Sequence, residues 1–167
     1  MKVFTFSNEK LTSIAFLVLR IGIGAVMFAH GSQKVLGLFG GKGLEASTTG
    51  LSTGLGIPLF FAYLSVFTEF LGGAGLLLGA LTRFFGIAMF INMLVAVLAV
   101  HLKNGLFAPT GFEYPGMMAI VALAITIAGP GLYSLDHVIF SGEGKTVPME
   151  KLRVGSNPSF KPVTKGA

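Results

Sequence analysis

The sequence predicts an all-α integral membrane protein, a bundle of four transmembrane helices with both termini in the cytoplasm. Hydrophobic residues make up 53% of its 167 residues and charged residues only 11%, and the mean hydropathy is positive. These values lie outside the range of ordinary soluble domains. Four stretches are apolar over about 20 residues, the length that crosses a hydrocarbon core.

The four stretches are read as helices because they lack the alternation of apolar and polar residues that a membrane barrel strand requires. The first could be mistaken for a cleaved signal peptide, but its apolar run is long, contains Arg20 and ends without a small-x-small cleavage site. We therefore expect it to remain as a helix. The expected helices cover residues 11–34, 57–81, 84–102 and 114–132.

The distribution of basic residues predicts the orientation. Four crossings place both termini on one side, and that side carries eight lysines and arginines against three on the other. Cytoplasmic loops of membrane proteins carry the excess of positive charge. The predicted orientation is thus one with both termini in the cytoplasm. The eight residues are Lys2, Lys10, Arg83, Lys145, Lys151, Arg153, Lys161 and Lys165, and the three are Lys34, Lys42 and Lys103.

The polar segments divide the chain into a bundle, residues 1–140, and a polar, basic cytoplasmic tail, residues 141–167. The first loop, residues 37–58, is too rich in glycine, serine and threonine for a continuous helix. It is expected to be either mobile or a short re-entrant or interfacial element. Gly75 and Gly79 form a GxxxG motif, which indicates close helix packing inside the bundle or an oligomer interface.

Charged residues at membrane depth need a partner or a purpose, because an isolated charge there costs roughly 3 kcal/mol or more. Counting residues from the helix ends places Arg20 and Glu69 at similar depths. We therefore predict an intramembrane ion pair between Arg20 and Glu69, with Asn92 close enough to add hydrogen bonds. The pair would either fix the register of the helices or line a polar cavity.

Polar side chains also gather at the outer ends of three helices, where a ligand could bind. Two histidines and a glutamate could hold a metal, and two histidines on separate helices could hold a haem. Neither pattern is specific, and no metal site is predicted. A quinone fits better, because its carbonyl oxygens accept hydrogen bonds from His, Gln or Lys while its ring lies among Phe and Met side chains. The expected site consists of His30, Gln33, Lys34, His101, Glu113 and Tyr114.

Several segments resemble the DoxX family of small four-helix bacterial membrane proteins. They read "LRIGIGAVMFAHGSQKVLGLFGG", "TEFLGGAGLLLGALTR", "INMLVAVLAVH", "FEYPGMMAIVALAI" and "GPGLYSLD", and they cover about residues 14–136. Some members of that family are linked to a thiosulfate:quinone oxidoreductase and others to membrane-associated redox complexes. The resemblance therefore implies a location in the bacterial inner membrane and quinone-linked redox chemistry or assembly with redox partners. It supplies no agreed list of catalytic residues.

Together these observations predict an integral membrane accessory subunit of a larger respiratory or redox complex, with a quinone-binding polar site near the outer leaflet. The alternatives are a quinone-linked oxidoreductase subunit of the thiosulfate:quinone type and a small-molecule transporter. The chain has no cysteine, hence no thiol redox centre. No intrinsic cofactor is predicted, a bound lipid or pigment stays open, and the expected partners are lipids and other membrane subunits, not nucleic acid.

Overall fold

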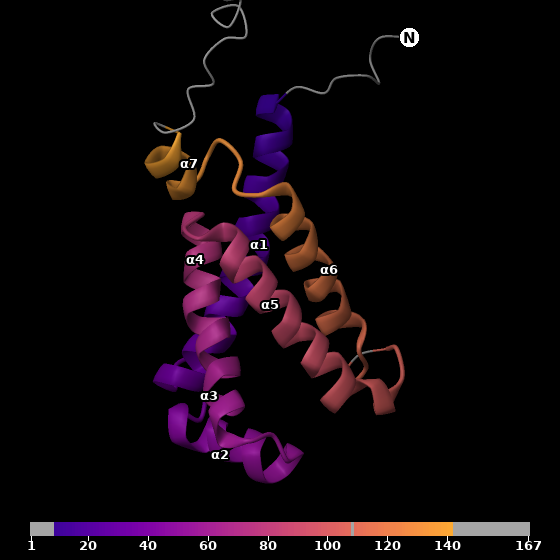
Figure 1. Ribbon diagram of the computed structural model, residues 1–167. Coiled ribbons are helices and arrows are strands. Elements are labelled where there is room, and N and C mark those ends of the chain that lie inside the picture. Colours follow the sequence, from indigo (N-terminus) through magenta and orange to yellow (C-terminus); the bar gives the residue numbers. More distant parts are fainter. Residues whose placement is uncertain (1–8, 108, 142–167) are drawn as a thin grey trace, which may run out of the picture.

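The computed structural model describes residues 9–107 and 109–141, and the regular structure of these residues is entirely helical (Figure 1). Three helical runs are long and apolar enough to cross a membrane: Glu9–Leu36, Leu59–Leu78 and Thr82–Asn104. The predicted all-α membrane bundle is therefore confirmed. The predicted tail, residues 141–167, lies outside the described residues except for Ser141.

The first run is helix α1, Glu9–Leu36, and it is followed by the short helix α2, Leu44–Leu55. Helix α2 occupies the loop for which the sequence left two alternatives open, and the structure agrees with a short element instead of a mobile loop. Gly56 ends α2 in the left-handed conformation, with φ of 68°, and its N–H donates to the carbonyl of Leu51. Glycine adopts this conformation at little cost, so it is a common helix terminator.

The second run consists of α3, Leu59–Phe67, the π-helical turn η1, Thr68–Gly72, and α4, Gly73–Leu78. The third run consists of α5, Thr82–Ala96, the π-helical turn η2, Val97–His101, and the short 3₁₀ turn η3, Leu102–Asn104. Each of these two runs therefore contains one π-helical turn of five residues.

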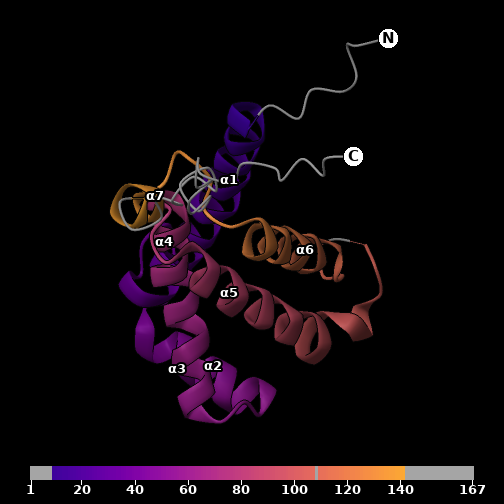
Figure 2. The same cartoon turned by 45° about the horizontal axis from the view of Figure 1, so that its top comes forward.

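The fourth apolar stretch forms α6, Glu113–Ala128, a helix of 16 residues. It is shorter than the predicted range 114–132, because Gly129 has φ of 85° and Pro130 lacks the N–H that would continue the helix. A last helix, α7, Leu135–Phe140, follows. Helix α6 runs back alongside α5 in both views, and α7 lies at the same end of the bundle as the start of α1 (Figures 1 and 2).

Helix α1 packs closely against η1 and α4, and glycines make this contact possible. A methyl group at Gly31 would collide with the backbone of Phe70, and one at Gly73 would collide with the backbone of Phe28. The expected packing role of the GxxxG glycines is also found inside the bundle. A methyl group at Gly75 would meet the ring of Phe85, and one at Gly79 would meet the guanidinium of Arg20.

The core lies between α1, α4, α5 and α6, and its side chains are almost fully buried. Helix α4 and helix α5 meet at the tight turn 79–81 and diverge towards α2, so the bundle opens at the end where α2 lies (Figures 1 and 2). The core thus fills one end of the bundle and leaves the other for a cavity. The core residues are Ile23, Met27, Leu76, Met89, Met93, Ala119, Ala122 and Ile125.

Candidate functional site

An ion pair lies at the open end of the bundle. It joins Lys34, in the last turn of α1, to Glu69, in the π-helical turn η1. The Nζ atom of Lys34 lies 2.5 Å from Oε1 of Glu69. The Glu69 side chain is 6% exposed and the Lys34 side chain 32%. Such a short, largely buried contact joins an ammonium to a carboxylate in a charge-assisted hydrogen bond.

The ion pair predicted between Arg20 and Glu69 is wrong. Helix α1 runs antiparallel to the second helical run, so Arg20 lies beside Gly79 while Glu69 lies beside Gly31, eleven positions further along α1. At 1.5 Å per residue this offset is about 16 Å. The depth count failed because α1 begins at Glu9 and extends beyond the turn that joins α4 to α5 (Figure 1).

Arg20 instead stabilises the closed end of the bundle, which is the end where the turn 79–81 joins α4 to α5. Its side chain is fully buried, and it donates to the carbonyl of Tyr133 at 2.5 Å and to that of Leu76 at 3.4 Å. Both acceptors are backbone carbonyls. Leu76 belongs to the last turn of α4, where the partial negative charge of the helix end attracts cations, and its carbonyl also accepts from the N–H of Gly79 at 3.3 Å. Arg20 is therefore a structural residue, far from Glu69 and Asn92.

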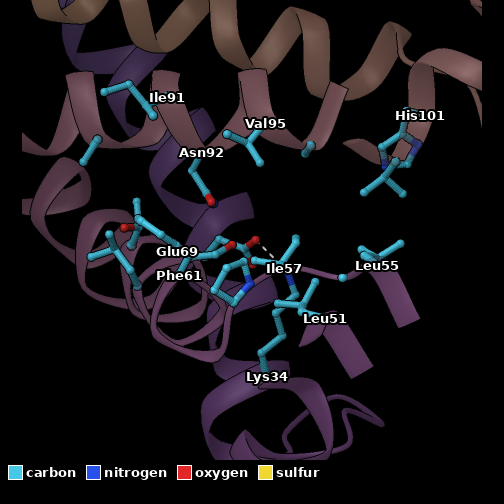
Figure 3. A pocket seen from close by; sticks show the side chains of 18 of the residues that line it. Lys34, Leu51, Leu55, Ile57, Phe61, Glu69, Ile91, Asn92, Val95 and His101 are labelled. Atoms are coloured by element: carbon cyan, nitrogen blue, oxygen red, sulfur yellow. Dashed lines mark hydrogen bonds and ion pairs between the residues drawn. The ribbon is translucent and has the colours of Figure 1, made fainter. Parts of the chain in front are cut away.

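A large groove lies between the two diverging arms of the bundle and has a volume of about 780 Å³. Leu51 and Leu55 of α2 and Phe61 and Leu64 of α3 form one side. Residues of α5 form the other, as Figure 3 shows for Ile91 and Val95. The size and the mostly apolar walls suit a ligand of drug-like size. The remaining lining residues are Lys34, Gly56, Ile57, Pro58, Ser65, Thr68, Glu69, Phe84, Ala88, Asn92, Ala96, Val100 and His101.

The polar groups of this groove are concentrated in one part of it. Lys34 and Glu69 meet on one side, and Asn92 extends from α5 on the other (Figure 3). Within the described residues, Oε2 of Glu69 and Nδ2 of Asn92 are buried and have no hydrogen-bond partner in the chain. Buried polar atoms are normally paired, so two such atoms on residues that line one groove point to a ligand or water there.

A second, smaller cavity of about 170 Å³ lies next to the ion pair and also contacts Lys34, Glu69 and His101. His30 of α1 and Tyr114 of α6 complete its polar wall, and their ring centroids are 6.2 Å apart. Nδ1 of His101 is 2.9 Å from the carbonyl of Thr110. Since a carbonyl only accepts, Nδ1 carries the hydrogen there, which leaves Nε2 as the acceptor of the neutral ring.

Four of the six residues expected to form the polar site therefore line this smaller cavity: His30, Lys34, His101 and Tyr114. Gln33 does not, because its side chain donates to the carbonyl of Phe39 at 3.1 Å on the exposed side of α1. Glu113 lines neither cavity. No group of three His, Asp or Glu side chains within residues 9–107 and 109–141 is placed to hold a metal ion.

Sequence reasoning missed the two π-helical turns, which present two of the polar residues of the site. Glu69 lies in η1 and His101 in η2, and both residues line both cavities. A π-helical turn inserts an extra residue into a helix and is frequent at functional sites. The only sequence signal was the presence of a charged or ionisable residue within an otherwise apolar run.

The fold and the site together define a class of protein: a small, multi-pass helical membrane protein with an apolar groove that ends on an ion pair. The DoxX family model matches residues 15–102, slightly more than half of the chain, and the chain belongs to the DoxX family. The resemblance noted in the sequence is thus confirmed.

One relative is the Bacillus subtilis (strain 168) protein named "Putative oxidoreductase CatD". It is 29% identical over 135 residues, which are 81% of this chain and 94% of the relative. No solved structure matches the chain with significance.

Proposed function

We propose that the protein is a membrane subunit of a redox assembly and that it binds a quinone-type ligand, as quinone or as quinol, in the groove between α2, α3 and α5. The groove carries this proposal. It combines about 780 Å³ of mostly apolar space with a small set of hydrogen-bonding groups, the combination that orients a flat ring bearing oxygen atoms and leaves room for a hydrocarbon tail. Membership of the DoxX family and the oxidoreductase name of the relative support the redox assignment.

The composition of the chain bears on where the electron-carrying cofactor would lie. A chain without cysteine has no thiol centre and no thiolate ligand for an iron–sulfur cluster. Electrons would therefore pass between the quinone and a cofactor of another subunit, while this chain binds and orients the ring. The excess of basic residues near the termini supports placing the termini in the cytoplasm, which puts the groove at the outer side of the inner membrane.

A substitution inside the groove tests the proposed binding. Ala88 lines the groove, and Ala88→Phe would fill part of it with a ring. We expect purified wild-type protein to bind decylubiquinone, offered in oxidised and in reduced form, and Ala88→Phe to weaken this binding at least tenfold. Isothermal titration in detergent measures both affinities.

Ala124→Phe is the matched control, because Ala124 is exposed on α6 and lines neither cavity. Its affinity should equal that of the wild type. Failure of the wild type to bind either redox form, or equal binding by Ala88→Phe, would refute the proposed site.

A further inference from the structure

The hydrogen bonding of Glu69 restricts which ligand can occupy the groove. Its Oε1 is held by the ammonium of Lys34, and Oε2 is buried with no donor among the described residues. The whole residue is 4% exposed. A carboxylate paired with an ammonium is ionised, and an ionised carboxylate only accepts hydrogen bonds. A well-matched ligand must therefore bring an N–H or O–H donor to Oε2.

Asn92 and Lys34 make no such demand, whereas Nε2 of His101, which also lines the groove, is an acceptor when the ring is neutral. The terminal amide of Asn92 offers a donor or, after a half turn, an acceptor. The ammonium of Lys34 has three N–H donors, and within residues 9–107 and 109–141 it makes one hydrogen bond, to Glu69. Both side chains can thus bind a ligand oxygen in either redox state. Discrimination between ligands falls on the acceptors, and among these Glu69 is the charged one, paired with Lys34.

Quinone and quinol differ in the required property. The oxygens of a quinone are carbonyls that only accept, whereas each hydroxyl of a quinol both donates and accepts. We propose that the groove binds the quinol form in preference to the quinone, and that Glu69 is the base that receives the phenolic proton. This inference rests on the proposed function. It specifies the redox form of the ligand and the residue that distinguishes it from the other form.

The step is a proton transfer alone. The phenolic O–H bond breaks, an O–H bond forms at Oε2 of Glu69, and the electron pair stays on the ligand oxygen as a phenolate. The ammonium of Lys34 and the amide of Asn92 stabilise that phenolate by donating to it. A phenolate is more easily oxidised than a phenol, so the step prepares the ligand for an electron acceptor in another subunit.

The smaller cavity supplies the onward path for the proton. Glu69 and His101 line both cavities, and the free Nε2 of His101 can accept a hydrogen. The ionisable groups around Glu69 are Lys34 and His30 on α1, His101 on η2 and Tyr114 on α6. A volume of about 170 Å³ holds several water molecules, since each fills about 30 Å³ in the liquid. The proton could therefore move through water to the surface near His30.

The test compares the affinities of both redox forms under anaerobic conditions. Decylubiquinol and decylubiquinone are titrated into the purified full-length protein, together with the dimethyl ether of the quinol, which has no O–H group. Wild-type protein should bind the quinol roughly ten- to a hundredfold more tightly than the quinone, the range for a hydrogen bond to a charged group. The dimethyl ether should bind at least as weakly as the quinone.

Glu69→Gln should abolish the preference, because its carboxamide can donate to a quinone carbonyl. Glu45→Gln is the matched control, since Glu45 is exposed in the first turn of α2 and lines neither cavity. It should keep the wild-type ratio. Equal affinities in the wild type, or tighter binding of the quinone, would overturn this inference while the proposed groove stands. Absence of binding by either form would refute the proposed function itself. The wild-type ratio needs no variant, so the test holds even if Glu69→Gln fails to fold.

Discussion

At the scale of single residues, the two buried charges of the apolar runs have separate tasks. Arg20 holds the closed end of the bundle through the carbonyls of Leu76 and Tyr133. Glu69 faces the cavities at the open end with Lys34. The sequence indicated that both charges need partners, but it could not identify them, because the register between two antiparallel helices depends on where each helix begins and on which small residues allow close contact.

Replacing Arg20 tests its structural task. Arg20→Ala removes two hydrogen bonds from a charged donor and takes away the donor that the buried guanidinium offers to the carbonyl of Tyr133. We therefore expect the free energy of unfolding to fall by about 3 kcal/mol. Arg20→Lys should lie between the wild type and Arg20→Ala, since a single ammonium reaches the two carbonyls less well than a fork of donors.

Denaturation in detergent measures the loss. Arg83→Ala is the control, because Arg83 is exposed and its removal should cost little. An Arg20→Ala variant as stable as Arg83→Ala would show that Arg20 does not tie the closed end together.

Four of the residues expected at the polar site meet in the structure for a simple reason. His30, Lys34, His101 and Tyr114 lie near helix ends on one side of the membrane, and antiparallel helices bring such ends together. Gln33 lies apart from them because it is on another face of α1, where its side chain donates to the carbonyl of Phe39. The direction in which a side chain points around the helix axis decides which neighbours it meets. Adjacent residues of a helix point about 100° apart.

At the scale of elements, the apolar runs predict helices, whereas local departures from the α conformation escape prediction. The four stretches of the sequence correspond to four helical segments whose ends shift by a few residues. The turns η1 and η2 depend on packing that only the folded bundle supplies. Helix α2 was equally hard to predict, because glycine, serine and threonine have low helix propensity, and its leucines gain stability by covering the groove.

The contact between α1 and η1 gives a prediction with an internal control on one helix. A methyl group at Gly31 would overlap the backbone of Phe70 next to Glu69, whereas one at Gly22 would have no neighbour within 4 Å. We expect Gly31→Ala to destabilise the protein by at least about 2 kcal/mol and to weaken ligand binding, because it displaces η1.

Gly22→Ala should leave binding unchanged and raise stability slightly, since alanine favours helix by up to about 1 kcal/mol relative to glycine. Unfolding in detergent and ligand titration check both variants. Equal effects of the two substitutions would argue against the close contact of α1 with η1.

At the scale of the whole molecule, one end of the bundle is closed and the other is open. The closed end is stabilised by the tight turn 79–81, Arg20 and α7. Asp136 of α7 accepts hydrogen bonds from the backbone N–H groups of Leu81 and Thr82 at 2.7 and 2.8 Å, where α5 begins. The arms diverge from this point (Figure 1). A rigid closed end fixes the angle between the arms, and thereby the width of the groove that binds the ligand.

The most direct test of the account is a mild-detergent purification of the protein from its native membrane. Mass spectrometry would identify every chain that copurifies, and organic extraction would identify the bound small molecules. The account predicts a redox subunit in stoichiometric amount and a quinone or quinol in the extract. A protein that emerges alone, with neither form of the ligand, would contradict it.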